Sequence, residues 1–164
     1  MSDVAPPETL SNQEGLAQLA HWILTDDYAT EWMGLEVLAL GDGSATVTTT
    51  LRREMLNGFG IAHGGMIFAI ADSAFALACN PHTPDEDQAG TITVAAGVDV
   101  NFLAPAHVGE RITAIASRRA QAGRSGLYDV QVFAASPEQD KDGEPSPRRL
   151  IAEFRGRSRT IPKH

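Results

Sequence analysis

The chain has 164 residues, 43% of them hydrophobic, and a formal net charge of −8. This length fits one domain with a substantial core, and the acidic balance argues against a nucleic-acid-binding protein. The charge is uneven. Residues 1–110 hold 15 acids and two cations, a balance of −13, whereas residues 111–164 hold 11 cations and six acids, a balance of +5. The basic third could attract an anionic ligand or could be an ordinary solvated strand face.

Several protein classes find no support. The N-terminus, MSDVAPPETL, lacks a secretory signal, and the longest apolar segment is shorter than the roughly 18 residues that a membrane span needs. The single cysteine, Cys79, excludes an internal disulfide and fits a reducing compartment, so a cytoplasmic location is expected. The five histidines show no metal-ligand spacing, and neither a metal site nor a cofactor is expected.

The first half of the chain predicts mixed elements. Residues 1–10 are expected to form a flexible arm, and Ser11 with Glu14 forms a capping-box pattern before a helical stripe that reaches Ile23. Strands are expected near 33–39 and over 45–51. A glycine-rich loop then leads into one long apolar helix over residues 66–79, and residues 80–90 read as a polar loop without periodicity.

The second half predicts strands only, over residues 92–102, 111–119, 127–134 and 150–159. Gly123 and Gly126 mark a hairpin between the second and third of these, and residues 136–149 are expected to form a mobile hairpin tip. The order of elements predicts an α+β fold in one domain over residues 1–164, with a single antiparallel sheet wrapped around the long helix. A doubly wound sheet is disfavoured because helices do not alternate with the later strands.

One acid stands out. Asp72 is the only charge in the apolar helix, where an ionised carboxylate is costly unless it is paired, hydrogen-bonded or facing a pocket. A neighbouring loop could brace it, but perturbed acids also gather at functional sites. The His63-Gly64-Gly65 turn before the helix leaves free backbone N–H groups where negative charge is favoured. A base beside an oxyanion donor indicates acyl chemistry.

The segments NGFGIAHGGMIFAIADSAFALACN, NFLAPAHVGE, GRSGLYDV and FRGRSR resemble the hotdog-fold acyl-CoA thioesterases of the phenylacetic-acid-degradation type. The match is collinear from about Trp32 to Ile161. The resemblance implies the hotdog fold, a curved antiparallel sheet around one central helix. It also implies hydrolysis of acyl-CoA thioesters, notably aryl-acetyl ones such as (hydroxy)phenylacetyl-CoA. It further implies a homodimer or a homotetramer, with no membrane or nucleic-acid partner.

The resemblance assigns roles to four residues of the central motif. Asp72 matches the catalytic carboxylate, which activates water or attacks directly, and Gly64 matches the glycine whose N–H polarises the thioester carbonyl. Asn57 matches the asparagine beside that carbonyl. His63 matches the adjacent active-site histidine, whose ring takes part in proton transfer or only braces the loop.

Further residues are expected to contact the substrate. Related enzymes often place a Ser or Thr near the start of the following strand to orient water, and Thr93 is the candidate here, in the stretch Thr93-Val94-Ala95-Ala96. Contacts with the thioester and the CoA moiety are expected from Gly65, Arg124, Ser125 and Gly126. The insertion at residues 83–89 and the long 136–149 segment depart from the short family pattern.

The spacing of the motif bears on assembly. Eight residues of α-helix span about 12 Å, so Gly64 and Asp72 of one chain cannot easily meet across one carbonyl. Two chains with antiparallel central helices could bring Gly64 of one near Asp72 of the other, and the resemblance implies the same shared site.

Two other functions remain open. A hotdog hydratase or dehydratase would pair a histidine with an acid in a different motif, and the spacing from HGG to Asp72 counts against it. A non-catalytic acyl-CoA sensor would usually need a DNA-binding or effector segment, for which residues 1–31 are too short and too acidic.

Overall fold

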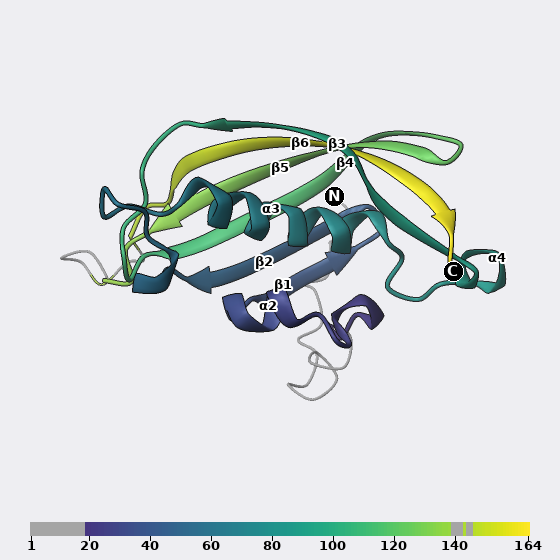
Figure 1. The fold of residues 1–164 in the computed structure, drawn as a ribbon, viewed down its shortest axis with the longest axis horizontal. Coiled ribbons are helices and arrows are strands. Elements are labelled where there is room, and N and C mark those ends of the chain that lie inside the picture. The colour runs from purple at the N-terminus through teal and green to yellow at the C-terminus, as the bar shows by residue number, and fades with distance from the viewer. Residues whose placement is uncertain (1–18, 139–142, 144–145) are drawn as a thin grey trace, which may run out of the picture.

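The structure is a computed structural model that describes residues 19–138, 143 and 146–164 (Figure 1). The expected arm over residues 1–10 and the capping-box residues Ser11 and Glu14 lie outside the described residues. So do positions 139–142 and 144–145 of the expected hairpin tip.

Within the described residues, eleven elements follow in chain order. The N-terminal part comprises η1 (Trp22–Leu24), α2 (Tyr28–Met33), β1 (Glu36–Gly41) and β2 (Ser44–Thr50). The central part comprises η2 (Arg53–Met55), α3 (Gly64–Cys79) and α4 (Glu86–Ala89). The C-terminal part is made of β3 (Thr91–Phe102), β4 (Arg111–Ala122), β5 (Ser125–Ala135) and β6 (Arg149–Pro162).

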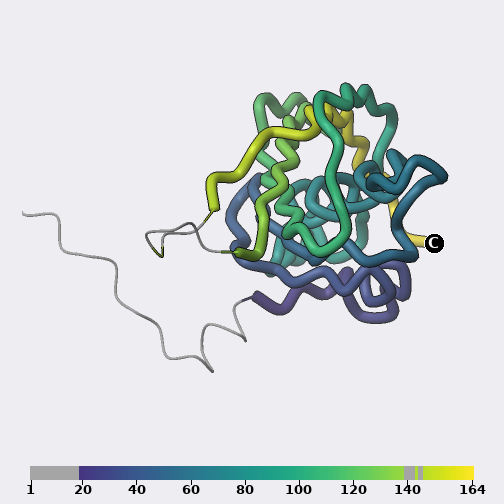
Figure 2. Tube along the Cα trace, turned by 90° about the vertical axis from the view of Figure 1, so that its left-hand side faces the viewer, coloured from purple at the N-terminus to yellow at the C-terminus, as the bar shows by residue number. Residues whose placement is uncertain are grey.

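The six strands form one antiparallel sheet in the order β1-β2-β4-β5-β6-β3. Helix α3 lies lengthwise along one face of this sheet, and the short helix α2 lies beside it (Figure 1). Seen from the end, the strands curve around the helix (Figure 2). The α+β prediction of a single sheet wrapped around one helix is confirmed, and this arrangement is the hotdog fold.

The core lies between α3 and the sheet. Phe75 of α3 packs its ring against Tyr128 of β5 and Phe154 of β6, with ring centroids 5.4 and 5.8 Å away. Gly156 makes this approach possible, since a Cβ there would lie 2.8 Å from the Phe75 ring. The glycine of the FRGRSR segment therefore serves the packing of the helix on the sheet.

In the N-terminal third, one expected strand is present with shifted ends and one expected helix is wrong. The strand expected near 33–39 begins later, at Glu36, because α2 runs to Met33 and ends on Gly34 in the left-handed region at φ 65°. The described part of the helical stripe is no α-helix but the 3-10 turn Trp22–Leu24, after which Asp26 turns the chain at φ 62°.

The other predicted elements are confirmed with small shifts in their ends. Helix α3 begins two residues earlier than expected, at Gly64. The 80–90 loop contains the one-turn helix α4, which a capping box between Asp85 and Gln88 stabilises. Among the described residues, none of the helices has the length and apolar character that crossing a membrane requires.

Candidate active site

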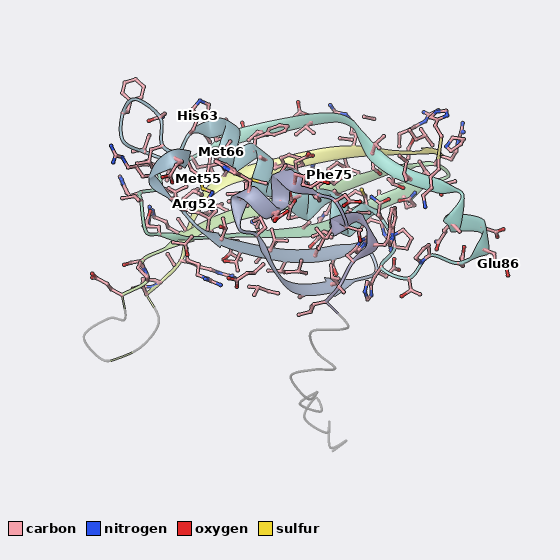
Figure 3. All side chains as sticks on the ribbon, turned by 60° about the horizontal axis from the view of Figure 1, so that its bottom comes forward. Arg52, Met55, His63, Met66, Phe75 and Glu86 are labelled. Atoms are coloured by element: carbon pink, nitrogen blue, oxygen red, sulfur yellow. The ribbon has the colours of Figure 1, made fainter. Side chains whose placement is uncertain are left out.

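The start of α3 is fixed by His63, the N-cap residue (Figure 3). The ring Nδ1 of His63 accepts a hydrogen bond of 2.9 Å from the Gly65 N–H. The backbone N–H of His63 donates to the carbonyl oxygen of Met55 at 2.8 Å. The ring therefore braces the turn through Nδ1, which acts as a hydrogen-bond acceptor. Gly65 uses its N–H in this cap, so within one chain it has none left for a substrate.

The Gly64 N–H is the donor that the turn leaves free. Its neighbours on either side are paired, whereas no acceptor for it lies within the described part of the chain. Gly64 occupies the first helical position, where the N–H has no partner inside the helix and the helix dipole favours negative charge. Phe102 lies over this glycine, since a Cβ there would be 3.2 Å from its ring.

Asn57 supplies a second donor beside Gly64. Its Oδ1 accepts hydrogen bonds from the N–H groups of Phe59 and Ile61 at 2.9 and 3.4 Å, which assigns the amide orientation. The Nδ2 group is then the free end of the side chain among the described residues. Asn57 and Gly64 line one cavity of about 420 Å³, whose other walls are mostly apolar: Ile61, Ala62, Ile67, Phe102, Leu103, Ala104, Pro105, Ala106 and Ile151.

Asp72 lies two turns further along α3 and faces a different cavity, of about 200 Å³. The carboxylate is half-buried, and burial raises its pKa above the ordinary value of 3.8. No loop donor or cation pairs with it in the part of the chain that the structure describes. The interpretation that a neighbouring loop holds Asp72 in place therefore has no supporting contact among the described residues.

The two cavities have no lining residue in common. Within one chain the structure thus brings Asn57 and Gly64 together and separates them from Asp72. This separation agrees with the helix-length estimate of about 12 Å.

The wall of the Asp72 cavity opposite α3 was not predicted. It comes from the segment that leads into α2 and from α2 itself, with Asp27 and Thr30 as its polar members. The Thr30 hydroxyl donates to Asp27 Oδ2 at 2.7 Å and lies 3.2 Å from the hydroxyl of Ser73 on α3. The available sequence signal was the N-cap spacing of Asp27 and Thr30, where the carboxylate accepts the Thr30 N–H at 3.0 Å.

The residues expected to bind CoA lie at the β4–β5 hairpin. Arg124 is exposed at its tip, beside the end of β6, because the Thr160 N–H donates to the Arg124 carbonyl and Ser125 is paired with Arg159. Gly126 is buried, and a Cβ there would lie 2.7 Å from Ser158 Oγ, so its role is close packing. In one chain this hairpin lies at the end of the sheet where α3 ends, away from Gly64 (Figure 1).

Most other arginines in the basic third, residues 111–164, form ion pairs with acids, and most of these acids belong to residues 1–110. The pairs are Arg111–Glu36, Arg118–Asp42, Arg119–Asp129, Arg149–Glu110, Arg155–Asp129 and Arg157–Asp99. Arg148 lies over the ring of Phe133, 4.4 Å from its centroid. Arg124 and Arg159 have no ion pair among the described residues, so no acid there neutralises their positive charge.

Thr93 lies near the end of α3 rather than beside Asp72. Its hydroxyl is 2.8 Å from that of Thr160, and its N–H donates to Asn80 Oδ1 at 2.9 Å. It lines a third cavity of about 550 Å³ that Asp72 does not reach. Its water-orienting role stays a prediction without a contact in one chain. Cys79 lines the same cavity, and burial raises the pKa of its thiol to about 12, which favours the protonated thiol.

Comparison with known proteins identifies the family to which the chain belongs. Residues 59–141 match the family model described as the thioesterase superfamily. The acyl-coenzyme A thioesterase PaaI of Escherichia coli (strain K12) is 34% identical over 144 residues, which cover 88% of this chain and 90% of that protein.

Solved structures agree with this match. The structure of the E. coli PaaI protein, from the phenylacetic acid degradation operon, aligns with a TM-score of 0.71 and 32% identity, covering 92% of this chain and 96% of that one. A mutant structure of phenylacetic acid degradation protein PaaI from Thermus thermophilus aligns with a TM-score of 0.65 and 33% identity, covering 81% of this chain and 98% of that one.

Proposed function

The chain belongs to the thioesterase superfamily, and from this premise we propose that it is an acyl-CoA thioesterase that releases a free acid and CoA. The observation that carries the proposal is the pair of half-sites on α3. One half offers two donors that have no partner among the described residues, the Gly64 N–H and Asn57 Nδ2, and the other offers the half-buried carboxylate of Asp72. A thioester carbonyl needs both a base for the attacking water and stabilisation of the oxyanion.

The proposed reaction uses water and the thioester alone. Asp72 accepts a proton from the attacking water while the water oxygen forms a bond to the carbonyl carbon. The carbonyl electron pair moves to its oxygen, where Gly64 of the partner subunit donates through its N–H and Asn57 of the partner subunit through Nδ2. Collapse of the tetrahedral intermediate breaks the C–S bond and expels the CoA thiolate, which takes up the proton from Asp72 and so regenerates the carboxylate. His63 holds the turn, as its cap geometry in one chain supports.

The shared site makes a homodimer the smallest working unit, and a homotetramer would contain two of them. Support comes from the two cavities, which share no lining residue within one chain. Exposed apolar side chains near the donor half provide surface for a second copy: Phe59, Phe68, Phe102 and Leu103. An exposed apolar group of this kind is expected at an interface between subunits.

An aryl-acetyl group such as (hydroxy)phenylacetyl is the proposed acyl part. Its support is the likeness to PaaI proteins whose names refer to phenylacetic acid degradation, together with the apolar walls around Asn57 and Gly64. The CoA phosphates are proposed to meet Arg124, the exposed arginine at the hairpin tip.

A thiol-release assay tests the proposal. The purified protein is expected to liberate CoA from phenylacetyl-CoA faster than from benzoyl-CoA or from short and medium alkanoyl-CoA. Binding of acyl-CoA without thiol release would contradict catalysis and favour a sensor. Fast release from alkanoyl-CoA alone would keep the thioesterase and overturn the aryl-acetyl assignment.

A further inference from the structure

The cavity that Asp72 faces has one wall from α3 and the other from the segment around α2. On α3, the residues Ala69, Asp72, Ser73 and Ala76 form one stripe at the spacing of neighbouring helical turns. Only four of the cavity's eleven residues carry polar side chains, namely Asp27, Thr30, Asp72 and Ser73. Ser73 and Asp72 are adjacent in sequence and open into the same small space.

The hydrogen bonds across this wall have a defined direction. A hydroxyl has one proton to donate and two lone pairs. The Thr30 proton goes to Asp27 Oδ2, an ionised acceptor 2.7 Å away, so Thr30 has none left for Ser73. In the 3.2 Å contact between the two hydroxyls, Ser73 must then be the donor and Thr30 the acceptor. The lone pairs of Ser73 Oγ remain available to the cavity.

Asp27 is itself held in place. Its Oδ1 accepts the N–H of Thr30 at 3.0 Å as the N-cap of α2, and this bond fixes the carboxylate at the start of the helix. The chain of bonds from Ser73 through Thr30 to Asp27 is therefore anchored at its far end by the backbone.

We propose that Ser73 is a catalytic residue that orients the attacking water, and that Thr30 and Asp27 are positioning residues that act through it. This proposal rests on the thioesterase activity proposed above. A water in the cavity donates one proton to the Asp72 carboxylate and the other to a lone pair of Ser73 Oγ. Both protons of the water are then held by hydrogen bonds, and a lone pair of its oxygen points away from them, toward the thioester carbonyl.

The step balances without a further reactant. The water oxygen bonds to the carbonyl carbon, its first proton moves to Asp72, and its second proton stays on the new carboxylic acid. The C–S bond then breaks, and the departing CoA thiolate takes up the proton that Asp72 holds. Ser73 keeps its own proton and forms no covalent bond. Its contribution is orientation of the nucleophile, which affects the turnover step rather than substrate binding.

The test begins with Ser73→Ala, Thr30→Val and the double variant, assayed with phenylacetyl-CoA. Ser73→Ala is expected to lower kcat by about 10-fold with little change in KM, on the scale of one lost hydrogen bond in the transition state. Thr30→Val keeps the backbone cap on Asp27 and should lower kcat less. The double variant should match Ser73→Ala, because Thr30 acts only through Ser73. Thr30→Ser keeps the hydroxyl and should restore kcat.

Thr49→Val is the matched control. The Thr49 hydroxyl donates to the Met33 carbonyl at 2.7 Å and so anchors the other end of α2. Met33 lines the Asp72 cavity, but Thr49 itself does not. Its loss should lower the melting temperature without lowering kcat. If Thr49→Val lowers kcat as much as Thr30→Val, the effect belongs to the docking of α2, and the proposed relay is overturned.

The remaining outcomes separate this proposal from the proposed function. Full activity of Ser73→Ala beside an inactive Asp72→Asn protein would overturn the role of Ser73 and leave the thioesterase intact. Additive losses in the double variant would overturn the relay through Thr30. If the wild-type protein hydrolyses no acyl-CoA, the failure lies with the proposed function itself.

Discussion

The Gly64 N–H can be removed without removing the helix that presents it. Gly64 is the first residue of α3, the position at which proline is best tolerated because that N–H has no partner in the helix. The preceding residue must then be extended, and His63 already is, with φ −64° and ψ 132°. Gly64→Pro therefore deletes one hydrogen-bond donor and keeps the backbone path.

Gly64→Ala is its matched control. A Cβ at this position lies 3.2 Å from the Phe102 ring, so the Cβ that both variants add requires the exposed ring of Phe102 to move by a few tenths of an ångström. Only the proline removes the donor. Loss of one oxyanion-hole donor costs about 10²–10³ in kcat, so we expect Gly64→Pro to show this loss and Gly64→Ala to keep most of the activity.

Steady-state thiol release with phenylacetyl-CoA measures the difference, and far-UV circular dichroism checks that both variants fold. Similar kcat values for folded Gly64→Pro and Gly64→Ala would refute the assignment of the N–H as oxyanion donor. The loss would then come from crowding at Phe102 rather than from the missing hydrogen bond.

Three further predictions concern the other half of the site, its assembly and its substrate. Asp72→Asn should lower kcat by about 10² or more, and near-normal turnover in the folded variant would exclude Asp72 as the base. Because burial raises the pKa of Asp72, ionisation destabilises the fold as pH rises through the window above 3.8. Asp72→Asn should therefore melt higher than wild type at pH 7 in thermal scans, with a gap that narrows toward pH 4. Subunit exchange between equal amounts of Asp72→Asn and Gly64→Pro chains should restore about one quarter of wild-type activity, since half the dimers are mixed and each has one intact site. No recovery after verified exchange would contradict the shared site. Arg124→Ala should raise KM for acyl-CoA more than it lowers kcat, since phosphate contacts are remote from the carbonyl. The same variant should act normally on a pantetheine thioester, and equal impairment of both substrates would assign Arg124 another role.

The fold was predictable because its main signals are long. The near absence of charge from α3 and the run of four strands after it predicted one sheet around one helix, and the structure has both. The short elements were missed because their signals are only one turn long. Helix α2 depends on the Asp27 cap and the Gly34 stop, and α4 depends on a capping box formed by Asp85 and Gln88.

The site was predictable only along α3. The distance between Gly64 and Asp72 follows from helix geometry, so one sequence could place them in separate half-sites. The wall opposite Asp72 comes from a segment more than forty residues earlier, and the contact between Thr30 and Ser73 spans 43 positions. Helical periodicity contains no information on which distant segment packs against the helix, so Asp27 and Thr30 could not be expected there.

Each chain thus presents two separate half-sites, each of which lacks the groups of the other. The carboxylate with a raised pKa carries a free-energy cost in the isolated chain, and neither it nor the Gly64 N–H has a protein partner among the described residues. In the proposed dimer a thioester carbonyl and a water molecule supply those partners together. The two groups without a protein partner in the subunit are then the groups that bind the transition state, and they need no reorganisation when the reaction occurs. This explains why the sole charge of α3 lies in its half-buried stretch rather than at an exposed end of the helix.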